Sequence, residues 1–160
     1  MTIEAGQHLP DANLTIMTAE GPSPVSATEL LGQGRVVLFA VPGPFTPTCS
    51  ANHLPGFRDN FQALKDKGVD KVVCTAVMDI FVMEAWRKDA GLEDQITMAA
   101  DGNGDFARAL GLEMDGRAFG MGMRSQRYAM IIKDGVVEQL LLDEPGGFRL
   151  SSAEYVLDQL

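Results

Sequence analysis

The 160-residue chain has few of the side chains that metal and disulfide chemistry require, with only two cysteines and two histidines. Neither cysteine belongs to a CxxC pair, and the spacing of these four residues is not typical of a zinc site. Basic residues are also scarce: 13 Lys and Arg stand against 22 Asp and Glu, for a net charge of −9. This charge argues against binding nucleic acid or an anionic membrane surface through bulk electrostatics. No apolar run approaches the ~20 residues of a membrane span. We therefore expect no cofactor, metal, nucleic acid or membrane partner.

The composition is that of an ordinary soluble globular protein, with 46% hydrophobic and 22% charged residues. A chain of this length suits one domain over residues 1–160 with one substantial core. The first residues, MTIEAGQHLPDANLT, lack the basic and apolar regions of a signal peptide, so we expect a cytoplasmic protein. In a reducing compartment we expect no structural disulfide between Cys49 and Cys74. Packing or redox chemistry remain as their roles.

Strand and helix patterns alternate along most of the chain. Apolar runs rich in β-branched residues predict strands, and turns with capping residues predict the helices between them. Asp134-Gly135 between two apolar runs predicts a hairpin. The order predicts an α/β fold with a mixed central sheet and helices on both faces. Strands are expected at 12–18, 36–41, 71–77, 96–100, 128–133 and 136–142, and helices at 26–32, 49–67, 81–90, 106–110 and 153–160. The Gly21-Pro22-Ser23-Pro24 segment is expected to be a turn, and residues 116–122 a loop. Ser151-Ser-Ala-Glu154 is expected to be the capping box of the last helix.

The segment VVLFAVPGPFTPTCSANHLPGF, residues 36–57, is the one around which the function is organised. A buried strand runs into four breakers (Pro42, Gly43, Pro44 and Pro47), and a helix is then expected to begin at Thr48 or Cys49 and to kink at Pro55. A cysteine at a helix start meets unpaired N–H groups and the positive end of the helix dipole. Both favour the thiolate, which is the reactive form of cysteine. Cys49 is thus a candidate nucleophile, and the Thr46 hydroxyl is close enough in sequence to reach the sulfur or a substrate.

Pro42, Thr46 and Cys49 together match the PxxxTxxC motif of the peroxiredoxins. The longer string PGPFTPTCSANHLPGF resembles the atypical, type-II-like subfamily, and the similarity extends through KVVCTAV, FVMEAW and RYAMIIKDG over nearly the whole chain. The resemblance implies a thioredoxin-like fold. It also implies an antioxidant oxidoreductase that reduces hydrogen peroxide or organic hydroperoxides.

The resemblance also assigns roles to individual residues. Cys49 is the peroxidatic cysteine, whose thiolate attacks the peroxide and becomes a sulfenic acid. Thr46 and the Cys49 N–H hold the peroxide, and Pro42 shields the thiolate. Arg127, at the start of a later strand, stabilises the thiolate and the developing charge.

Two further residues keep alternative interpretations. His53 lies one helical turn after Cys49, where it can border the pocket or serve only as a packing residue. Cys74 lies mid-strand in an apolar run, which favours an inert buried thiol, although it is the only internal candidate for a resolving cysteine. Residues 143–155, where some relatives carry a resolving cysteine, contain none. We therefore expect glutathione, glutaredoxin or thioredoxin to reduce Cys49, and we expect a homodimer from the family's habit.

Other functional classes fit the residues less well. A non-catalytic peroxide sensor or redox interaction protein has no need of Pro42, Thr46, Cys49 and Arg127 together. A thioredoxin-type reductase requires a second cysteine that Cys49-Ser-Ala-Asn52 lacks. A cysteine protease needs a histidine and an Asn or Asp around the nucleophile, and the chain offers only two histidines.

Overall fold

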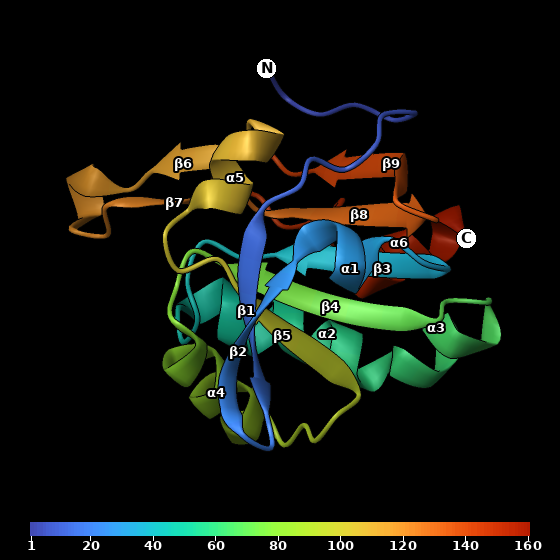
Figure 1. Ribbon diagram of the computed structural model, residues 1–160, viewed down its shortest axis with the longest axis horizontal. Coiled ribbons are helices and arrows are strands. Elements are labelled where there is room, and N and C mark those ends of the chain that lie inside the picture. The colour runs from blue at the N-terminus through green and yellow to red at the C-terminus, as the bar shows by residue number, and fades with distance from the viewer.

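A seven-stranded mixed sheet forms the centre of the protein. The computed structural model describes residues 1–160. The strands of this sheet are β1 (Asn13–Thr18), β2 (Gly21–Ser26), β3 (Arg35–Ala40), β4 (Lys71–Ala76), β5 (Ile96–Ala100), β8 (Tyr128–Lys133) and β9 (Val136–Leu142). Their spatial order is β2-β1-β5-β4-β3-β8-β9 (Figure 1). The central strands β3, β4 and β5 are parallel, and the outer strands pair antiparallel, so the expected mixed sheet is confirmed.

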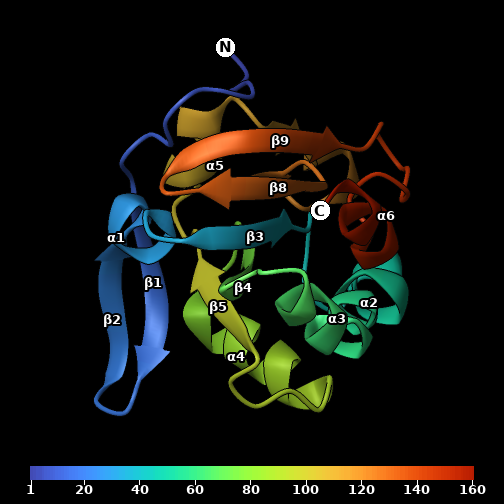
Figure 2. The same ribbon diagram turned by 90° about the vertical axis from the view of Figure 1, so that its right-hand side faces the viewer.

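Helices cover both faces of this sheet (Figure 2). The helices are α1 (Ala27–Leu31), α2 (Leu54–Asp59), α3 (Phe61–Asp66), α4 (Ile80–Asp89), α5 (Asp105–Leu110) and α6 (Ala153–Gln159). Buried residues of α2, α3, α4 and α6 form one apolar cluster with one face of the sheet. Buried residues of α1 and α5 form a second cluster on the opposite face. Because successive β3 residues contribute alternately to the two clusters, β3 is apolar throughout from Val36 to Ala40.

The expected turn at residues 21–24 is wrong, because this segment is the strand β2. Prolines are tolerated there because β2 is the edge strand, paired only with β1. Pro22 and Pro24 alternate with less exposed residues and lie opposite Met17 and Thr15 of β1. Neither proline has to donate a hydrogen bond to a further strand. The two prolines also keep this open edge from pairing with other chains.

The single helix expected over residues 49–67 is three segments. Cys49–His53 forms a π-helical turn, η1, in which the Leu54 N–H bonds the Cys49 carbonyl. Pro55 falls in the first turn of α2, directly after η1, and because His53 and Leu54 before it already have helical backbone angles, the chain stays helical through Pro55. The break comes at Asn60, whose side-chain amide donates to the Gly56 carbonyl at 2.8 Å. The Asn60 N–H donates to the same carbonyl at 3.0 Å, so the Gly56 carbonyl accepts two bonds from Asn60 where α2 ends.

The glycine-rich segment 116–122 is a loop, as expected. It connects the two strands of an antiparallel hairpin, β6 (Glu113–Asp115) and β7 (Met123–Ser125), which the sequence pattern did not predict because they are so short. The connection includes a 3-10 turn, η2 (Arg117–Phe119). The cap of α6 is Ser152, which accepts from the Tyr155 N–H, and not Ser151. No helix is both long and apolar enough to cross a membrane.

Candidate active site

Cys49 lies at the point where the chain leaves β3 and begins η1. The segment from Pro42 to Thr48 crosses the end of the sheet, and Cys49 is fully buried although it follows an irregular loop. The neighbouring Ser50 is fixed from two sides, since its N–H donates to the Thr46 carbonyl at 2.9 Å and its hydroxyl accepts from Trp86 Nε1 at 2.9 Å. The π-helical turn is therefore tied to both the preceding loop and α4. Turns of this kind often occur at functional sites.

Arg127 brings a positive charge directly to the Cys49 sulfur. Its Nη2 donates to Cys49 Sγ at 3.0 Å, although 77 residues separate the two positions in the chain. Arg127 immediately precedes β8, which pairs with β3, so the register of these two strands delivers the guanidinium to the end of β3 where Cys49 lies. A guanidinium donor at this distance stabilises negative charge on the sulfur. The structure thus brings together the two residues on which the expected chemistry depends most.

Thr46 and Pro42 are positioned by the loop itself and by Arg124. Thr46 Oγ1 donates to the Gly43 carbonyl, not to the sulfur, which leaves its oxygen as an acceptor. The Pro42 carbonyl accepts from Arg124 Nη1 at 3.3 Å, while Arg124 Nε donates to the Met121 carbonyl at 2.8 Å. Arg124 of β7 therefore connects the β6–β7 hairpin to the active-site loop. No local pattern points to this connection, because the three-residue strand that carries Arg124 is too short to predict.

His53 is a buried residue of the site, with both ring nitrogens in use. Arg127 Nη1 lies 2.7 Å from Nδ1, and the Ser151 carbonyl lies 3.0 Å from Nε2. Burial, with a smaller contribution from the Arg127 charge, lowers the pKa of His53 to about 3. The imidazole is therefore neutral at physiological pH. His53 contacts Arg127, and this contact favours the interpretation that His53 borders the pocket over a role in packing only.

Cys74 is as fully buried as Cys49, but its thiol lies in a different electrostatic environment. It lies in the middle of β4, opposite Phe39 of β3, and is fully buried in the apolar cluster under α2 and α4. Burial raises the pKa of the Cys74 thiol well above its usual value, and the nearby Cys49 adds to the effect. Both cysteines are free thiols. These features fit a packing residue, and the inert role of Cys74 stays a prediction.

The segment after β9 is a part of the site that sequence reasoning missed. Asp143 accepts hydrogen bonds from the N–H groups of Arg149, Leu150 and Ser151 and from the Ser151 hydroxyl. Burial of this carboxyl opposes ionisation, but these hydrogen bonds outweigh burial and lower its pKa. The segment also places Phe148 against the site, 5.8 Å from the Arg127 guanidinium carbon and 5.1 Å from the His53 ring. The sequence pattern around Ser151 and Ser152 indicates only a helix cap.

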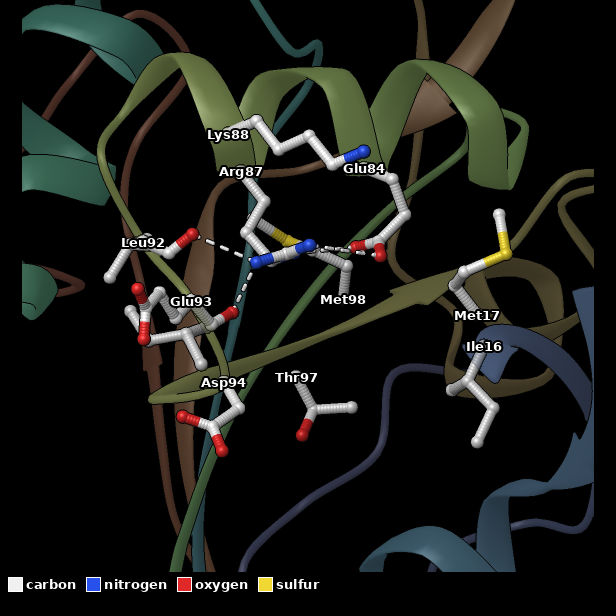
Figure 3. Close-up of a pocket in the computed structure, with 11 residues that line it drawn as sticks. Ile16, Met17, Glu84, Arg87, Lys88, Leu92, Glu93, Asp94, Thr97 and Met98 are labelled. Carbon is white, nitrogen blue, oxygen red and sulfur yellow. Dashed lines mark hydrogen bonds and ion pairs between the residues drawn. The ribbon is translucent and has the colours of Figure 1, made fainter. Parts of the chain in front are cut away.

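A surface cavity of about 770 Å3 is lined by none of these residues. It lies between α4 and the strands β1 and β5 (Figure 3). The Arg87 guanidinium in its wall is already engaged, since it pairs with Glu84 at 2.8 Å and donates to the carbonyls of Leu92 and Glu93. The lining contains neither cysteine nor histidine. We therefore place the thiol chemistry at Cys49 and not in this cavity.

Known proteins resemble this chain over its whole length. The Redoxin family model matches residues 4–157. The Arabidopsis thaliana protein "Peroxiredoxin-2E, chloroplastic" is 45% identical over 99% of this chain and 70% of its own length. Peroxiredoxin-2B of the same plant is 38% identical over 99% of this chain and 98% of its own. A crystal structure of reduced Prx3 in complex with H2O2, from Vibrio vulnificus, has a TM-score of 0.95 and 49% identity, covering 99% of each chain.

These similarities confirm the thioredoxin-like fold that the PxxxTxxC motif implied. The match spans the loop with Cys49, the strand that follows Arg127 and the C-terminal helix alike. The buried cysteine with its arginine neighbour is thus found in the context that the motif predicts. The chain belongs to the peroxiredoxin family and is a thiol peroxidase.

Proposed function

We propose that this protein reduces hydrogen peroxide and organic hydroperoxides with Cys49 as its only reacting cysteine, and that an external thiol resets it. The observation that carries the proposal is the 3.0 Å hydrogen bond from Arg127 Nη2 to Cys49 Sγ. The relative from Vibrio vulnificus, described in complex with H2O2, supports hydrogen peroxide as one substrate. Two donors, the Cys49 N–H and Arg127, and one acceptor, Thr46 Oγ1, match the hydrogen-bonding groups of a hydroperoxide.

In the first half of the cycle, the Cys49 thiolate attacks the terminal peroxide oxygen. A sulfur–oxygen bond forms as the oxygen–oxygen bond breaks, so the sulfur is oxidised to a sulfenic acid and the peroxide is reduced. The leaving oxygen takes up a proton and departs as water or alcohol. The Arg127 guanidinium lies beside the sulfur and stabilises the negative charge as it moves toward the leaving oxygen. Thr46 Oγ1 accepts a hydrogen bond from the peroxide hydroxyl and orients the peroxide.

In the second half, an external thiol takes the place of a resolving cysteine. The thiol condenses with the sulfenic acid to a mixed disulfide and releases water. A second thiol then attacks that disulfide and regenerates the Cys49 thiol. Cys74 is unsuited to the first of these steps, because burial raises the pKa of its thiol, whereas the equally buried Cys49 has the Arg127 guanidinium beside its sulfur. Glutathione, glutaredoxin and thioredoxin are the proposed reductants. All three belong to reducing compartments, and the cytoplasmic location stays a prediction.

Mass spectrometry of peroxide-treated protein distinguishes these cycles. We expect treatment with one equivalent of peroxide and then glutathione to give one glutathione adduct on Cys49, with Cys74 free. If thioredoxin is the reductant, a thioredoxin variant lacking its resolving cysteine gives a mixed disulfide at Cys49 instead. The Cys74→Ala variant serves as the matched control and should give the same adduct. An internal Cys49–Cys74 bridge as the main product would contradict the one-cysteine cycle.

A homodimer through the active-site face is the second part of the proposal. Two aromatic side chains are exposed on this face: Phe45 in the active-site loop, 51% exposed, and Phe119 in the connection between β6 and β7, 81% exposed. Arg124 joins these two segments, so both aromatic residues belong to one region of the surface. Exposed apolar surface of this kind is typical of interaction sites. We expect sedimentation to show a dimer that Phe119→Ser weakens, and a monomeric wild-type protein would contradict it.

A further inference from the structure

The Arg127 guanidinium divides its donors between two acceptors. Nη2 donates to Cys49 Sγ at 3.0 Å, and Nη1 lies 2.7 Å from His53 Nδ1. The guanidinium is planar and rigid, so fixing one of its nitrogens fixes the direction of the others. Phe148 stacks near the same group, with the guanidinium carbon 5.8 Å from its ring centre, but a ring face does not select a direction within the guanidinium plane. His53 is the hydrogen-bond acceptor that does.

The hydrogen bonds of His53 determine its tautomer. The guanidinium can only donate, so His53 Nδ1 must be the unprotonated nitrogen that accepts. The proton is then on Nε2, where it is donated to the Ser151 carbonyl at 3.0 Å. The opposite tautomer would place an N–H against Arg127 and a lone pair against a carbonyl oxygen, and both contacts would be repulsive. The Ser151 carbonyl therefore selects the tautomer that can accept from Arg127.

Asp143 holds the Ser151 carbonyl in place. Its carboxylate accepts from three successive N–H groups, those of Arg149 to Ser151, at 3.0, 2.7 and 3.2 Å, and from the Ser151 hydroxyl. Its own N–H donates to the Arg127 carbonyl at 3.1 Å. Asp143 thus fixes the returning segment against the residue that carries the guanidinium. Asp143 and Ser151 are both buried, which makes these bonds costly to leave unmade.

From this connected set of contacts we infer that His53 is a positioning residue: its neutral Nδ1 aims Arg127 at Cys49, and Asp143 supports it through the Ser151 carbonyl. The inference deepens the proposed function, since it concerns the same reacting thiol. It also gives the segment after β9 a role in the peroxide reaction, through orientation of the arginine and with no reacting atom of its own.

A purely structural role for His53 would need only its ring contacts. The imidazole packs between aromatic rings, with Phe39 at 5.0 Å, Phe148 at 5.1 Å and Phe57 at 5.7 Å between ring centres. An apolar side chain would satisfy such an environment without leaving polar atoms to pair. The two hydrogen bonds that the ring makes are what a packing role does not require, and each can be removed separately.

Two amide variants separate the two nitrogens. In His53→Asn, Oδ1 lies near the position of Nδ1 and can still accept from Arg127. In His53→Gln, Nε2 lies near the ring Nε2 and can still donate to the Ser151 carbonyl, but the acceptor toward Arg127 is gone. We expect His53→Gln to slow oxidation of Cys49 by hydrogen peroxide about tenfold, as one charge-assisted hydrogen bond is lost. We expect His53→Asn to stay within about threefold of the wild type.

Thiolate formation provides a readout that a packing defect would not move. We expect the midpoint pH of ultraviolet thiolate absorbance, with the Cys49→Ser trace subtracted, to rise in His53→Gln and to stay near the wild-type midpoint in His53→Asn. Trp86 bonds Ser50 beside Cys49, so its fluorescence shows whether the turn is intact in each variant. If wild-type Cys49 forms thiolate but does not react with peroxide, the proposed function fails, while the comparison of the two amides still tests His53.

Asp143→Asn tests the support at a distance. The amide presents an N–H₂ group to backbone N–H groups, so we expect the segment to loosen and the oxidation rate to fall in the same direction as in His53→Gln, by a smaller factor. Combined with His53→Gln it should add nothing, because the contact it supports is already lost. Equal effects of the two His53 amides, or full additivity of Asp143→Asn with His53→Gln, would overturn the inference. Should His53→Gln fail to fold, additivity is measured with Arg127→Ala instead.

Discussion

Replacing Cys49 by serine abolishes peroxide consumption, down to the rate of the buffer. The expected effect is this large because the remaining cysteine offers no route to a thiolate: Cys74 is fully buried in β4 with a raised pKa. A serine hydroxyl at position 49 keeps the size and the hydrogen bond to Arg127, but it does not ionise near neutral pH and does not form a sulfenic acid. The measurement is stopped-flow consumption of hydrogen peroxide with glutathione or thioredoxin in excess.

The matched control is Cys74→Ala, which should retain most of the activity. Alanine is preferred to serine here because a hydroxyl buried in the apolar cluster would be left without a partner. The small cavity lowers stability modestly and leaves the site untouched. Two variants that are equally inactive would show that both cysteines take part and that the reset by an external thiol is wrong. Activity in Cys49→Ser would place the reaction elsewhere.

The central part of the fold could be predicted from the sequence because its signals are local. The Ile96–Ala100 strand and the hairpin at Asp134-Gly135 were predicted with their observed boundaries. Asp134 and Gly135 both have positive φ, which explains why this pair of residues is needed there. Apolar runs of β-branched residues and short polar turns depend on neighbours in the chain, so a pattern along the sequence is sufficient.

The predictions that were wrong concern residues whose conformation or bonding depends on partners distant in the sequence. Pro22 and Pro24 indicate a turn unless the strand is known to lie at the edge of a sheet. Ser151 matches a capping box, but its hydroxyl is taken by Asp143, which lies in another segment. At the break between α2 and α3, the Asn60 side chain also donates to Glu154 Oε1 of α6, at 3.4 Å. In each case tertiary contacts overrode a local preference.

The candidate site divides in the same way. Cys49 and Thr46 lie within one motif, whereas Arg127 was assigned through resemblance, since nothing in its local sequence points to a cysteine so far away. His53 could be placed near Cys49 by helical spacing, but only the structure shows that it contacts Arg127. Asp143 carried no signal at all: a single acidic residue after a strand is common, and its four hydrogen bonds exist only in the folded protein.

Arg127→Ala slows the oxidation of Cys49 by about 10²–10³-fold, the usual loss when one donor to a developing negative charge is removed. It also shifts thiolate formation to higher pH, because the 3.0 Å hydrogen bond to Sγ is lost. The oxidation rate of Arg127→Lys should lie between those of the wild type and Arg127→Ala, since an ammonium keeps the charge but does not direct two donors in one plane toward Sγ and His53 Nδ1.

The control is Arg149→Ala: this exposed arginine stacks on Tyr155 and makes no contact with the sulfur. Second-order rate constants for oxidation by hydrogen peroxide, measured under single turnover, test the series. An unchanged rate in Arg127→Ala would remove this arginine from the reaction, and an equal loss in Arg149→Ala would mean that the series reports only the net charge around the site.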